Sequence, residues 1–417
     1  MKVFFVSLGC DKNLVDSEKM LGMLQTNNYE LTDDETEADI IVINTCAFIN
    51  DAKEESINTI IEMAKQKETG KCQKLIVTGC LAQRYKEEIK AELPEVDLIF
   101  GMSEYEPEHQ TAKRVVTTGG HYAHLKIAEG CDKYCTYCII PKLRGRYRSF
   151  PMEQLIAEAK ELAENGVKEL ILVAQETTLY GVDLYGEKKL HELLKELCKI
   201  SGIQWIRILY CYPEEIYDGL IQVMKEEKKI CHYLDIPIQH ASDNILKRMN
   251  RRTNKEQLIS MINKLRTEIP DIALRTTLIS GFPGETEDDH EELMEFIDEM
   301  EFERLGVFAY SPEEGTPAAE MPDQIEEEVK EERKDALMEL QQDISSDLSQ
   351  DKIGRILTVM IEGKVADENA YVGRTYMDAP NIDGYIFVNT DEELMSGDFC
   401  RVKVTGALEY DLIGELV

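Results

Sequence analysis

Residues 129–141 read EGCDKYCTYCIIP, and the three cysteines in this stretch, Cys131, Cys135 and Cys138, are spaced C-x3-C-x2-C. A structural zinc site normally uses four protein ligands, and so does an ordinary iron–sulfur cluster. Three thiolates leave one coordination position open, as a reactive metal centre requires. The alternative is half of a split zinc ribbon, but no second C-x2-C pair follows at ribbon spacing. The triplet therefore favours a reactive centre.

The region around this triplet, about 119–325, alternates apolar runs with helical patterns. Such alternation predicts βαβ units and a parallel sheet. A complete eight-unit barrel would need more chain, so six units predict a partial (βα)6 barrel. The six expected strands are HLKIA (124–128), KELILVA (168–174), WIRILY (205–210), HYLDIPI (232–238), IALRTTLIS (272–280) and RLGVFAY (304–310).

The flanking regions predict two further domains. Residues 1–118 also alternate strand and helix patterns, with apolar runs at 2–8, 38–45, 74–79 and 96–100, and we expect a parallel sheet. A charged helical stretch at 326–350 resembles a connector. The short β-like runs that follow predict a small OB-like β-barrel. The fold class is therefore α/β, with domains expected at 1–118, 119–348 (with the connector helix) and 349–417.

Three more cysteines each follow an apolar run directly: Cys10 ends KVFFVSLGC, Cys46 ends ADIIVINTC and Cys80 ends KLIVTGC. The carboxyl ends of parallel strands lie at one edge of a sheet, where ligands bind. We therefore expect the three thiols to meet there and to hold a 4Fe–4S cluster with one iron free of protein ligands. The alternatives are small apolar cysteines that end buried strands, and zinc held by three cysteines and water.

The composition limits the classes of function. The formal net charge of −34 argues against a protein that coats nucleic acid, because phosphate binding depends on Lys and Arg. The apolar run in the opening MKVFFVSLGCDKN is too short for a signal peptide, and no stretch approaches the ~18 apolar residues of a membrane helix. We expect a cytoplasmic protein, in which the eleven cysteines are thiols or metal ligands.

Several motifs together resemble the radical S-adenosylmethionine (SAM) methylthiotransferase family. They are SLGCDKNLVDSE (7–18), NTCAFI (44–49), TGCLAQRY (78–85), EGCDKYCTYCIIPKLRG (129–145) and GFPGETEDD (281–289). The order of domains is similar as well, and the last would be the TRAM barrel of that family. The resemblance covers essentially the whole chain.

The resemblance implies an enzyme with two 4Fe–4S clusters that uses SAM, first as a radical source and then as a methyl donor. Cys131, Cys135 and Cys138 would hold the cluster that cleaves SAM to methionine and a 5′-deoxyadenosyl radical. Cys10, Cys46 and Cys80 would hold the cluster that carries the sulfur. Catalytic residues beyond the clusters are not assigned, and an electron donor such as a flavodoxin or ferredoxin is implied. The other SAM-binding positions would be Tyr137, Gln175, Glu176, Gln239, Gly281 and Gly284.

Some of these positions have simpler interpretations. Gln175 and Glu176 also fit an ordinary polar loop. The turn GFPGE lacks the Lys-Ser/Thr of a phosphate-binding loop. We expect Arg144, Arg146 and Arg148 to be solvated, although they could meet an acidic target. The remaining cysteines form no spacing pattern and are interpreted as packing or surface residues; they are Cys72, Cys198, Cys211, Cys231 and Cys400.

The sequence resembles the ribosomal, RimO-type branch more than the MiaB-type branch that modifies tRNA adenosine. SLGC-x-KN-x-VDSE, LYCYPEEI (209–216) and IPIQHAS (236–242) carry this resemblance. It implies methylthiolation of the β-carbon of an aspartate in ribosomal protein uS12.

The charge of the last domain agrees with that branch. Residues 351–417 contain six Lys/Arg and thirteen Asp/Glu, a net charge of −7, which suits a basic protein better than RNA. A generally acidic composition is the simpler explanation. The open alternatives are a tRNA methylthiotransferase and a non-enzymatic iron–sulfur carrier. We also expect removal of 351–417 to leave reductive SAM cleavage largely intact and to reduce modification of the ribosomal protein sharply.

Overall fold

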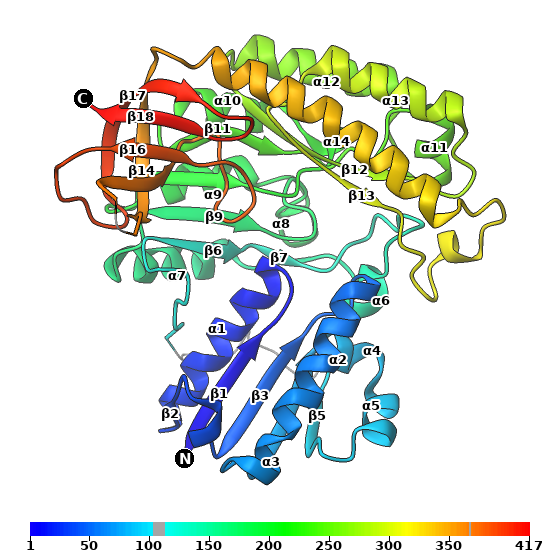
Figure 1. Cartoon of the computed structure of the whole chain (residues 1–417), viewed down its shortest axis with the longest axis vertical. Helices are drawn as coiled ribbons and strands as arrows, with labels where there is room; N and C mark the ends of the chain where they lie inside the picture. Colours follow the sequence, from blue (N-terminus) through cyan, green and yellow to red (C-terminus); the bar gives the residue numbers. More distant parts are fainter. Residues whose placement is uncertain (103–112, 367) are drawn as a thin grey trace. The chain divides into compact units, whose positions relative to one another are not determined.

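The computed structural model describes residues 1–102, 113–366 and 368–417 (Figure 1). Contacts divide the chain into two compact units that are not consecutive in sequence. The N-terminal unit comprises Met1–Thr117, Glu129–Arg148 and Ser311–Ala319, and the C-terminal unit comprises Thr118–Ala128, Ser149–Tyr310 and Glu320–Val417. The cysteine triplet thus belongs to the N-terminal unit, and the boundaries expected at 118 and 348 stay a prediction.

The N-terminal unit is built on a five-stranded parallel sheet of order β2-β1-β3-β4-β5. The central strand β3 is buried along its whole length, as its apolar sequence predicts. The strands are β1 (Lys2–Ser7), β2 (Glu30–Leu31), β3 (Ile40–Thr45), β4 (Lys74–Gly79) and β5 (Leu98–Phe100). The helices are α1 (Asp11–Thr26), α2 (Asn50–Ala64), α3 (Gln66–Thr69), α4 (Cys80–Arg84), α5 (Lys86–Glu92) and α6 (Ile140–Arg144).

The C-terminal unit contains the six expected strands in an open parallel sheet of order β13-β12-β11-β10-β9-β6. The chain adds each strand next to the one before it, which confirms the partial barrel. The strands are β6 (Tyr122–Lys126), β9 (Glu169–Val173), β10 (Trp205–Ile208), β11 (Ile230–Asp235), β12 (Ala273–Ser280) and β13 (Arg304–Ala309). The helices between them are α7 (Met152–Glu164), α8 (Val182–Tyr185), α9 (Leu190–Cys198), α10 (Asp218–Glu226), α11 (Asp243–Arg248), α12 (Lys255–Glu268) and α13 (Glu287–Met300).

The last five strands close into the small barrel that the sequence predicts, in the order β14-β15-β16-β18-β17. They appear orange to red in Figure 1. Their bounds are β14 (Ile356–Lys364), β15 (Ala370–Arg374), β16 (Ile386–Asn389), β17 (Phe399–Ala407) and β18 (Leu412–Leu416). One apolar cluster joins Val359 and Ile386 of this barrel to Tyr122 and Tyr233 of the open sheet. The two parts therefore share a core.

Buried charges also join the small barrel to the amino-terminal ends of the open strands. Glu169, the first residue of β9, is fully buried and lies 2.8 Å from Arg207 Nε and 2.7 Å from Arg374 Nη2. Arg207 also donates to the carbonyl of Tyr376 at 2.6 Å. Removing residues 351–417 would take Arg374 away from Glu169 and the carbonyl of Tyr376 away from Arg207, and only the pair between Glu169 and Arg207 would remain. We therefore expect this truncation to destabilise the preceding domain, so the expectation that SAM cleavage stays largely intact needs that domain to remain folded.

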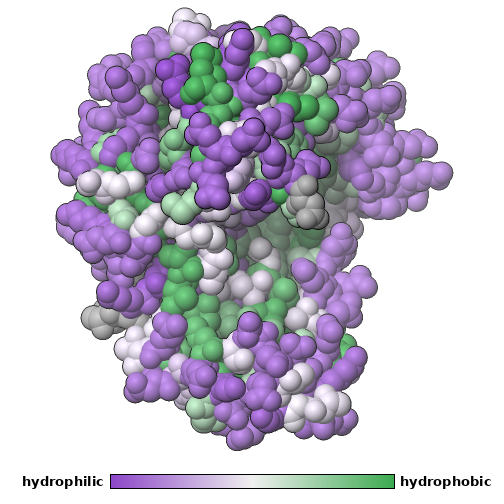
Figure 2. Space-filling model, turned by 60° about the vertical axis from the view of Figure 1, so that its left-hand side comes forward, coloured by the Kyte–Doolittle hydropathy of each residue, from purple (hydrophilic) through white to green (hydrophobic). Residues whose placement is uncertain are grey.

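The helix α14 (Glu327–Gln350) does more than connect two domains. Gln341 donates to the carbonyl of Phe302 at 2.8 Å, and Arg333 pairs with the buried Glu285 at 3.0 Å. The helix is therefore part of the packing of the open sheet. Among the described residues, no helix is long and apolar enough to cross a membrane. Hydrophilic side chains cover most of the face shown in Figure 2, in keeping with the acidic composition.

Candidate functional site

Cys10, Cys46 and Cys80 follow β1, β3 and β4, which are neighbours in the N-terminal sheet. Gly9 has φ +88°, and a Cβ added there would lie 2.7 Å from Cβ of Cys46 and 2.9 Å from its sulfur. The loop that carries Cys10 is therefore pressed against Cys46. Cys80 is the first residue of α4, directly after the end of β4. The structure thus brings the three thiols together at the carboxyl edge of the sheet.

The three thiols differ in their exposure to solvent. Cys10 is exposed, whereas Cys46 and Cys80 are buried. Burial, helped by the other two thiols, raises the pKa of Cys80 to about 11, although the guanidinium of Arg144 opposes this rise. Burial likewise raises the pKa of Cys46. A soft metal that binds thiolates would supply the positive charge that two buried thiolates need, so the donor set fits an iron–sulfur cluster.

Arg144 is placed differently from the expectation that it is a solvated loop residue. Its side chain is 1% exposed and forms a 3.0 Å ion pair with Asp16. Its Nη2 lies 3.6 Å from the sulfur of Cys80. Arg146 is solvated as expected, with 85% of its side chain exposed, and Arg148 is also exposed. Residue type alone did not distinguish these arginines, and the expectation was wrong for Arg144.

The polar residues that follow Cys10 in α1 are buried and form a hydrogen-bonded network, which the cysteine spacing alone does not predict. Asn13 donates from Nδ2 to the carbonyl of Leu8 at 2.6 Å and to that of Thr45 at 3.3 Å. Leu8 lies in the loop that carries Cys10, and Thr45 is the last residue of β3. Asn44 donates in turn to the carbonyl of Asn13 at 3.0 Å. A run of polar residues on the buried face of α1 is the sequence signal that indicates such a layer.

The triplet Cys131, Cys135 and Cys138 lies in a compact loop of the N-terminal unit, flanked in sequence by β7 (Ala128–Glu129) and β8 (Arg148–Ser149). The amide of Cys131 donates to the carbonyl of Gly145 at 3.2 Å, and the amide of Cys138 donates to that of Cys135 at 3.0 Å. Cys131 and Cys135 are buried and Cys138 is partly exposed. The loop is therefore closed at its base, and its three cysteines match the donor set of a second cluster.

Within the described residues, no three His, Cys, Asp or Glu side chains are grouped so as to hold a single metal ion. The case for clusters therefore rests on the donor sets and their placement. The other five cysteines are buried or partly buried, and none of the eleven, all of which are described, takes part in a disulfide.

Three of the residues expected at the SAM site, Gln175, Glu176 and Gln239, follow the carboxyl ends of strands β9 and β11 in the C-terminal unit. Gln175 and Glu176 follow β9, and the buried carboxylate of Glu176 accepts from the amide of Thr178 at 2.7 Å and from its hydroxyl. Gln239 follows β11 with φ +74°, and its backbone N–H donates to the carbonyl of Thr277 at 2.9 Å. These residues share one edge of the open sheet, whereas Tyr137 belongs to the N-terminal unit.

Gly281 and Gly284 shape the turn after β12. Their φ angles are +70° and +80°, and a Cβ would lie 2.3 Å from Cγ of Lys330 at Gly281 and 2.6 Å from Cζ of Arg248 at Gly284. Glycine is therefore required by backbone conformation and by packing. The carboxylate of the buried Glu285 accepts from the backbone amide of Gly281 at 2.8 Å and fixes the turn, a role that the motif GFPGE alone does not reveal.

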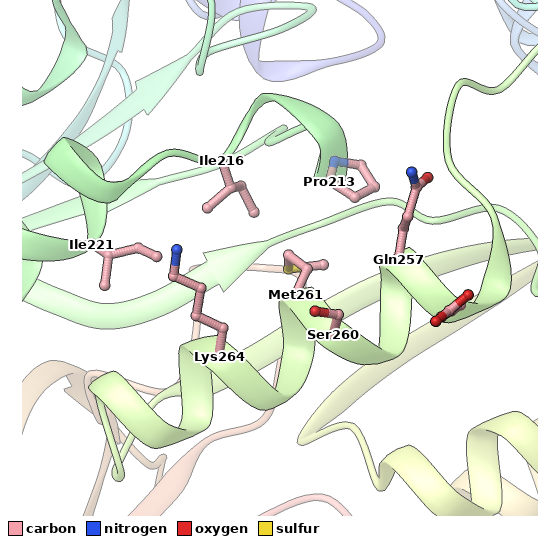
Figure 3. Close-up of a pocket in the computed structure, with 8 residues that line it drawn as sticks. Pro213, Ile216, Ile221, Gln257, Ser260, Met261 and Lys264 are labelled. Atoms are coloured by element: carbon pink, nitrogen blue, oxygen red, sulfur yellow. The ribbon is translucent and has the colours of Figure 1, made fainter.

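Two surface pockets contain none of the residues expected at the site. The pocket in Figure 3 has a volume of about 380 Å³ and lies beside α10 and α12, lined by Pro213, Ile216, Ile221, Glu256, Gln257, Ser260, Met261 and Lys264. The other, of about 450 Å³, lies on the small barrel and is lined by Glu362, Gly363, Lys364, Val372, Pro380, Asn381, Tyr385 and Phe387.

Comparison with known proteins identifies the three regions. Residues 2–101 match the family described as Uncharacterized protein family UPF0004, residues 125–297 match the Radical SAM superfamily, and residues 353–417 match the TRAM domain. Among solved structures, the radical SAM methyltransferase TsrM from Kitasatospora setae aligns with a TM-score of 0.56 at 12% identity, over 88% of this chain and 79% of that one. This likeness shows the fold. The fold and the matched regions define a radical SAM enzyme with a C-terminal TRAM barrel.

Curated relatives define the family more narrowly. The ribosomal protein uS12 methylthiotransferase RimO of Lachnoclostridium phytofermentans is 64% identical over 99% of this chain and 99% of its own length. RimO proteins of Clostridium perfringens and Clostridioides difficile are 53% and 51% identical, over 99% and 100% of this chain and 97% and 99% of their own lengths. The chain therefore belongs to the RimO family of methylthiotransferases.

Proposed function

We propose that this enzyme adds a methylthio group to the β-carbon of an aspartate in ribosomal protein uS12, using two 4Fe–4S clusters and two molecules of SAM. Cys131, Cys135 and Cys138 would hold one cluster. Cys10, Cys46 and Cys80 would hold the other. A small redox protein such as a flavodoxin or ferredoxin would supply electrons, and the reaction would take place in the cytoplasm.

The observation that carries the proposal is the meeting of three strand-end thiols at one edge of the N-terminal sheet. Three neighbouring strands each present one cysteine; two of these thiols are buried, and one of the two, Cys80, lies 3.6 Å from the guanidinium of Arg144. A chain that needed cysteine only for packing has no reason to gather three at a ligand-binding edge. The relative at 64% identity, a uS12 methylthiotransferase by name, supports the same activity.

The chemistry explains why such cofactors are needed. The hydrogens on the β-carbon of aspartate are too weakly acidic for a side-chain base to remove, and bound clusters with SAM supply radical, sulfur and methyl chemistry. The residues of the chain hold and shield the reactants. The loop of Cys131–Cys138 is closed by the hydrogen bond to Gly145, and the turn at Gly281 is fixed by Glu285. Gln175, Glu176, Gln239, Gly281, Gly284 and Tyr137 are proposed to contact SAM.

The acidic TRAM barrel supports a protein substrate over tRNA. Its net charge is −7, and the loop between β16 and β17 exposes Asp391, Glu392 and Glu393 in succession. Arg374, one of its few basic residues, is fully buried in ion pairs. The barrel surface is therefore complementary to a basic ribosomal protein and would repel phosphate.

The proposal is tested with the full-length protein after anaerobic reconstitution, incubated with SAM, a reductant and either purified uS12 or tRNA. We expect 5′-deoxyadenosine, S-adenosylhomocysteine and a methylthio group on one aspartate of uS12. Methylthiolation of tRNA adenosine with uS12 unchanged would move the activity to the tRNA branch. A reconstituted protein that fails to cleave SAM would support an iron–sulfur carrier instead.

A further inference from the structure

The buried Arg144 is the residue that connects the two cysteine sets of the N-terminal unit. It is the last residue of α6, six positions after Cys138, yet its guanidinium lies against Cys80. A guanidinium with 1% of its side chain exposed has lost its water and needs several partners. The free-energy cost of burying this guanidinium indicates that its positive charge has a specific role at this position.

The partners of the guanidinium come from both sides. Nη1 lies 3.0 Å from Asp16 of α1 and 3.0 Å from Glu129, which stands two positions before Cys131. Nη2 donates to Oδ1 of Asn13 at 3.1 Å and lies 3.6 Å from the sulfur of Cys80. One terminal nitrogen of the guanidinium therefore faces two carboxylates, and the other faces a side-chain amide and a thiol.

Asn13 extends these contacts to the other two cysteine loops. Its Nδ2 donates to the carbonyl of Leu8, two positions before Cys10, and to that of Thr45, one position before Cys46. Arg144 reaches Cys80 directly. One polar group, Asn13 with Arg144, therefore fixes all three strand ends that carry the first cysteine set.

We propose that Arg144 is a positioning residue of the centre at Cys10, Cys46 and Cys80, and that its charge sets the reduction potential of that centre under the control of Glu129 in the second cysteine segment. The inference rests on the proposed function, because it needs a cluster on these cysteines. A cation beside a thiolate ligand stabilises the reduced, more negative state of a cluster. The carboxylate of Glu129 partly offsets that charge.

The test uses the full-length chain in which Cys131, Cys135 and Cys138 are replaced by Ala, so that a single cluster signal remains. Iron content and the midpoint potential from an EPR-monitored redox titration are measured for this parent and for Arg144→Gln, Arg144→Lys and Glu129→Gln. Arg146→Gln is the matched control, because this exposed arginine lies two positions away in the same segment.

In Arg144→Gln we expect the equilibrium constant for reduction to fall at least tenfold, which corresponds to about 59 mV toward negative potential for a one-electron couple. Arg144→Lys keeps the charge and shifts the potential less. Glu129→Gln shifts it in the positive direction, which a merely structural role would not produce, and Arg146→Gln leaves it unchanged.

Equal midpoint potentials in the parent, Arg144→Gln and Glu129→Gln would overturn the inference. Shifts of the same sign in Arg144→Gln and Glu129→Gln would overturn it as well. If Arg144→Gln holds no iron, the sign of the shift in Glu129→Gln decides. A parent that binds no iron would instead refute the second cluster of the proposed function, and the inference with it.

Discussion

Cysteine reactivity in the metal-free protein differs among the three thiols at the edge of the N-terminal sheet. Only the thiolate reacts rapidly with alkylating reagents. Burial raises the pKa of Cys80 to about 11, so at neutral pH this residue is a buried thiol, whereas Cys10 is exposed. The thiolate fraction of Cys80 therefore rises with pH and reaches one half near pH 11.

We therefore expect iodoacetamide to label Cys10 at least tenfold faster than Cys80 at neutral pH, and the labelling of Cys80 to accelerate as the pH is raised. Mass spectrometry of tryptic peptides after short reaction times measures both rates. The exposed Cys10 serves as the internal reference for the buried Cys80 in the same sample. Equal rates at neutral pH would contradict the burial of Cys80.

Replacing Cys131, Cys135 and Cys138 together by Ala removes the ligands proposed for the SAM-binding cluster. We expect reconstituted iron to fall from about eight to about four per chain, because each 4Fe–4S cluster has four irons, and reductive SAM cleavage to be lost. Iron and sulfide assays with chromatography of 5′-deoxyadenosine measure both results. A control that changes Cys72, Cys198 and Cys400 to Ser should keep all of its iron. Full iron in the triplet variant would exclude Cys131, Cys135 and Cys138 as ligands.

The sequence predicted the positions of the cysteines because each follows a short apolar run, and parallel strands align their ends. It did not predict the environment of Arg144. Arg144, Arg146 and Arg148 alternate in one short segment, and nothing local distinguishes them. Only the packing of this segment against Asp16, more than a hundred residues away, decides which of them is buried.

At the scale of elements, the strands were predicted where apolar runs are continuous. The two-residue strand β2 was missed because it carries no such run. The role of α14 was also incomplete: its sequence is charged, but Lys330 and Arg333 are buried against the turn after β12. A pattern of charge cannot show that a basic side chain will be covered by an acidic partner.

The ion pairs of Glu169 with Arg207 and Arg374 give a test of how the TRAM barrel is held. Replacing Arg374 by Met leaves the buried carboxylate with fewer partners, and we expect the free energy of unfolding to fall by about 3–5 kcal/mol. The matched change Arg401→Met, at an exposed position of the same barrel, should alter it by about 0.5 kcal/mol or less.

Urea unfolding followed by circular dichroism measures both variants. We expect the radical SAM part and the barrel of Arg374→Met to unfold at lower urea together, because they share one core. Equal stability of the two variants would show that the barrel is attached by other contacts.

At the scale of the whole molecule, distant segments assemble one unit. Residues 311–319 join the N-terminal unit, where the buried Glu313 pairs with Lys53 at 2.9 Å and Arg84 at 3.0 Å. No local pattern in the sequence predicts such long-range pairing. The net charge of a region, in contrast, is read directly from the sequence, and the acidic TRAM barrel was predicted in this way.

Changing Asp391, Glu392 and Glu393 together to Lys tests the barrel as the docking surface for uS12. We expect about tenfold weaker binding of uS12 at low salt and a smaller difference as salt rises, because screening shortens the reach of exposed charges to about 8 Å at physiological ionic strength. Reductive SAM cleavage should not change. Fluorescence anisotropy with labelled uS12 measures the affinity.

The control carries the same change of charge on α13, at the exposed Glu291, Glu295 and Asp298. It should weaken binding much less. Equal losses in both variants would show that total charge matters and that the barrel is not the docking surface.

The most direct test of the central claim is mass spectrometry of uS12 and of tRNA from cells with and without this gene. Cells that express the protein should carry a methylthio group on one aspartate of uS12. Cells lacking it should lose that group and regain it when the wild-type gene is returned, but not when the gene encodes Cys80→Ala. Unmodified uS12 in cells that express the protein, or loss of a methylthio group from tRNA in the deletion strain, would contradict the claim.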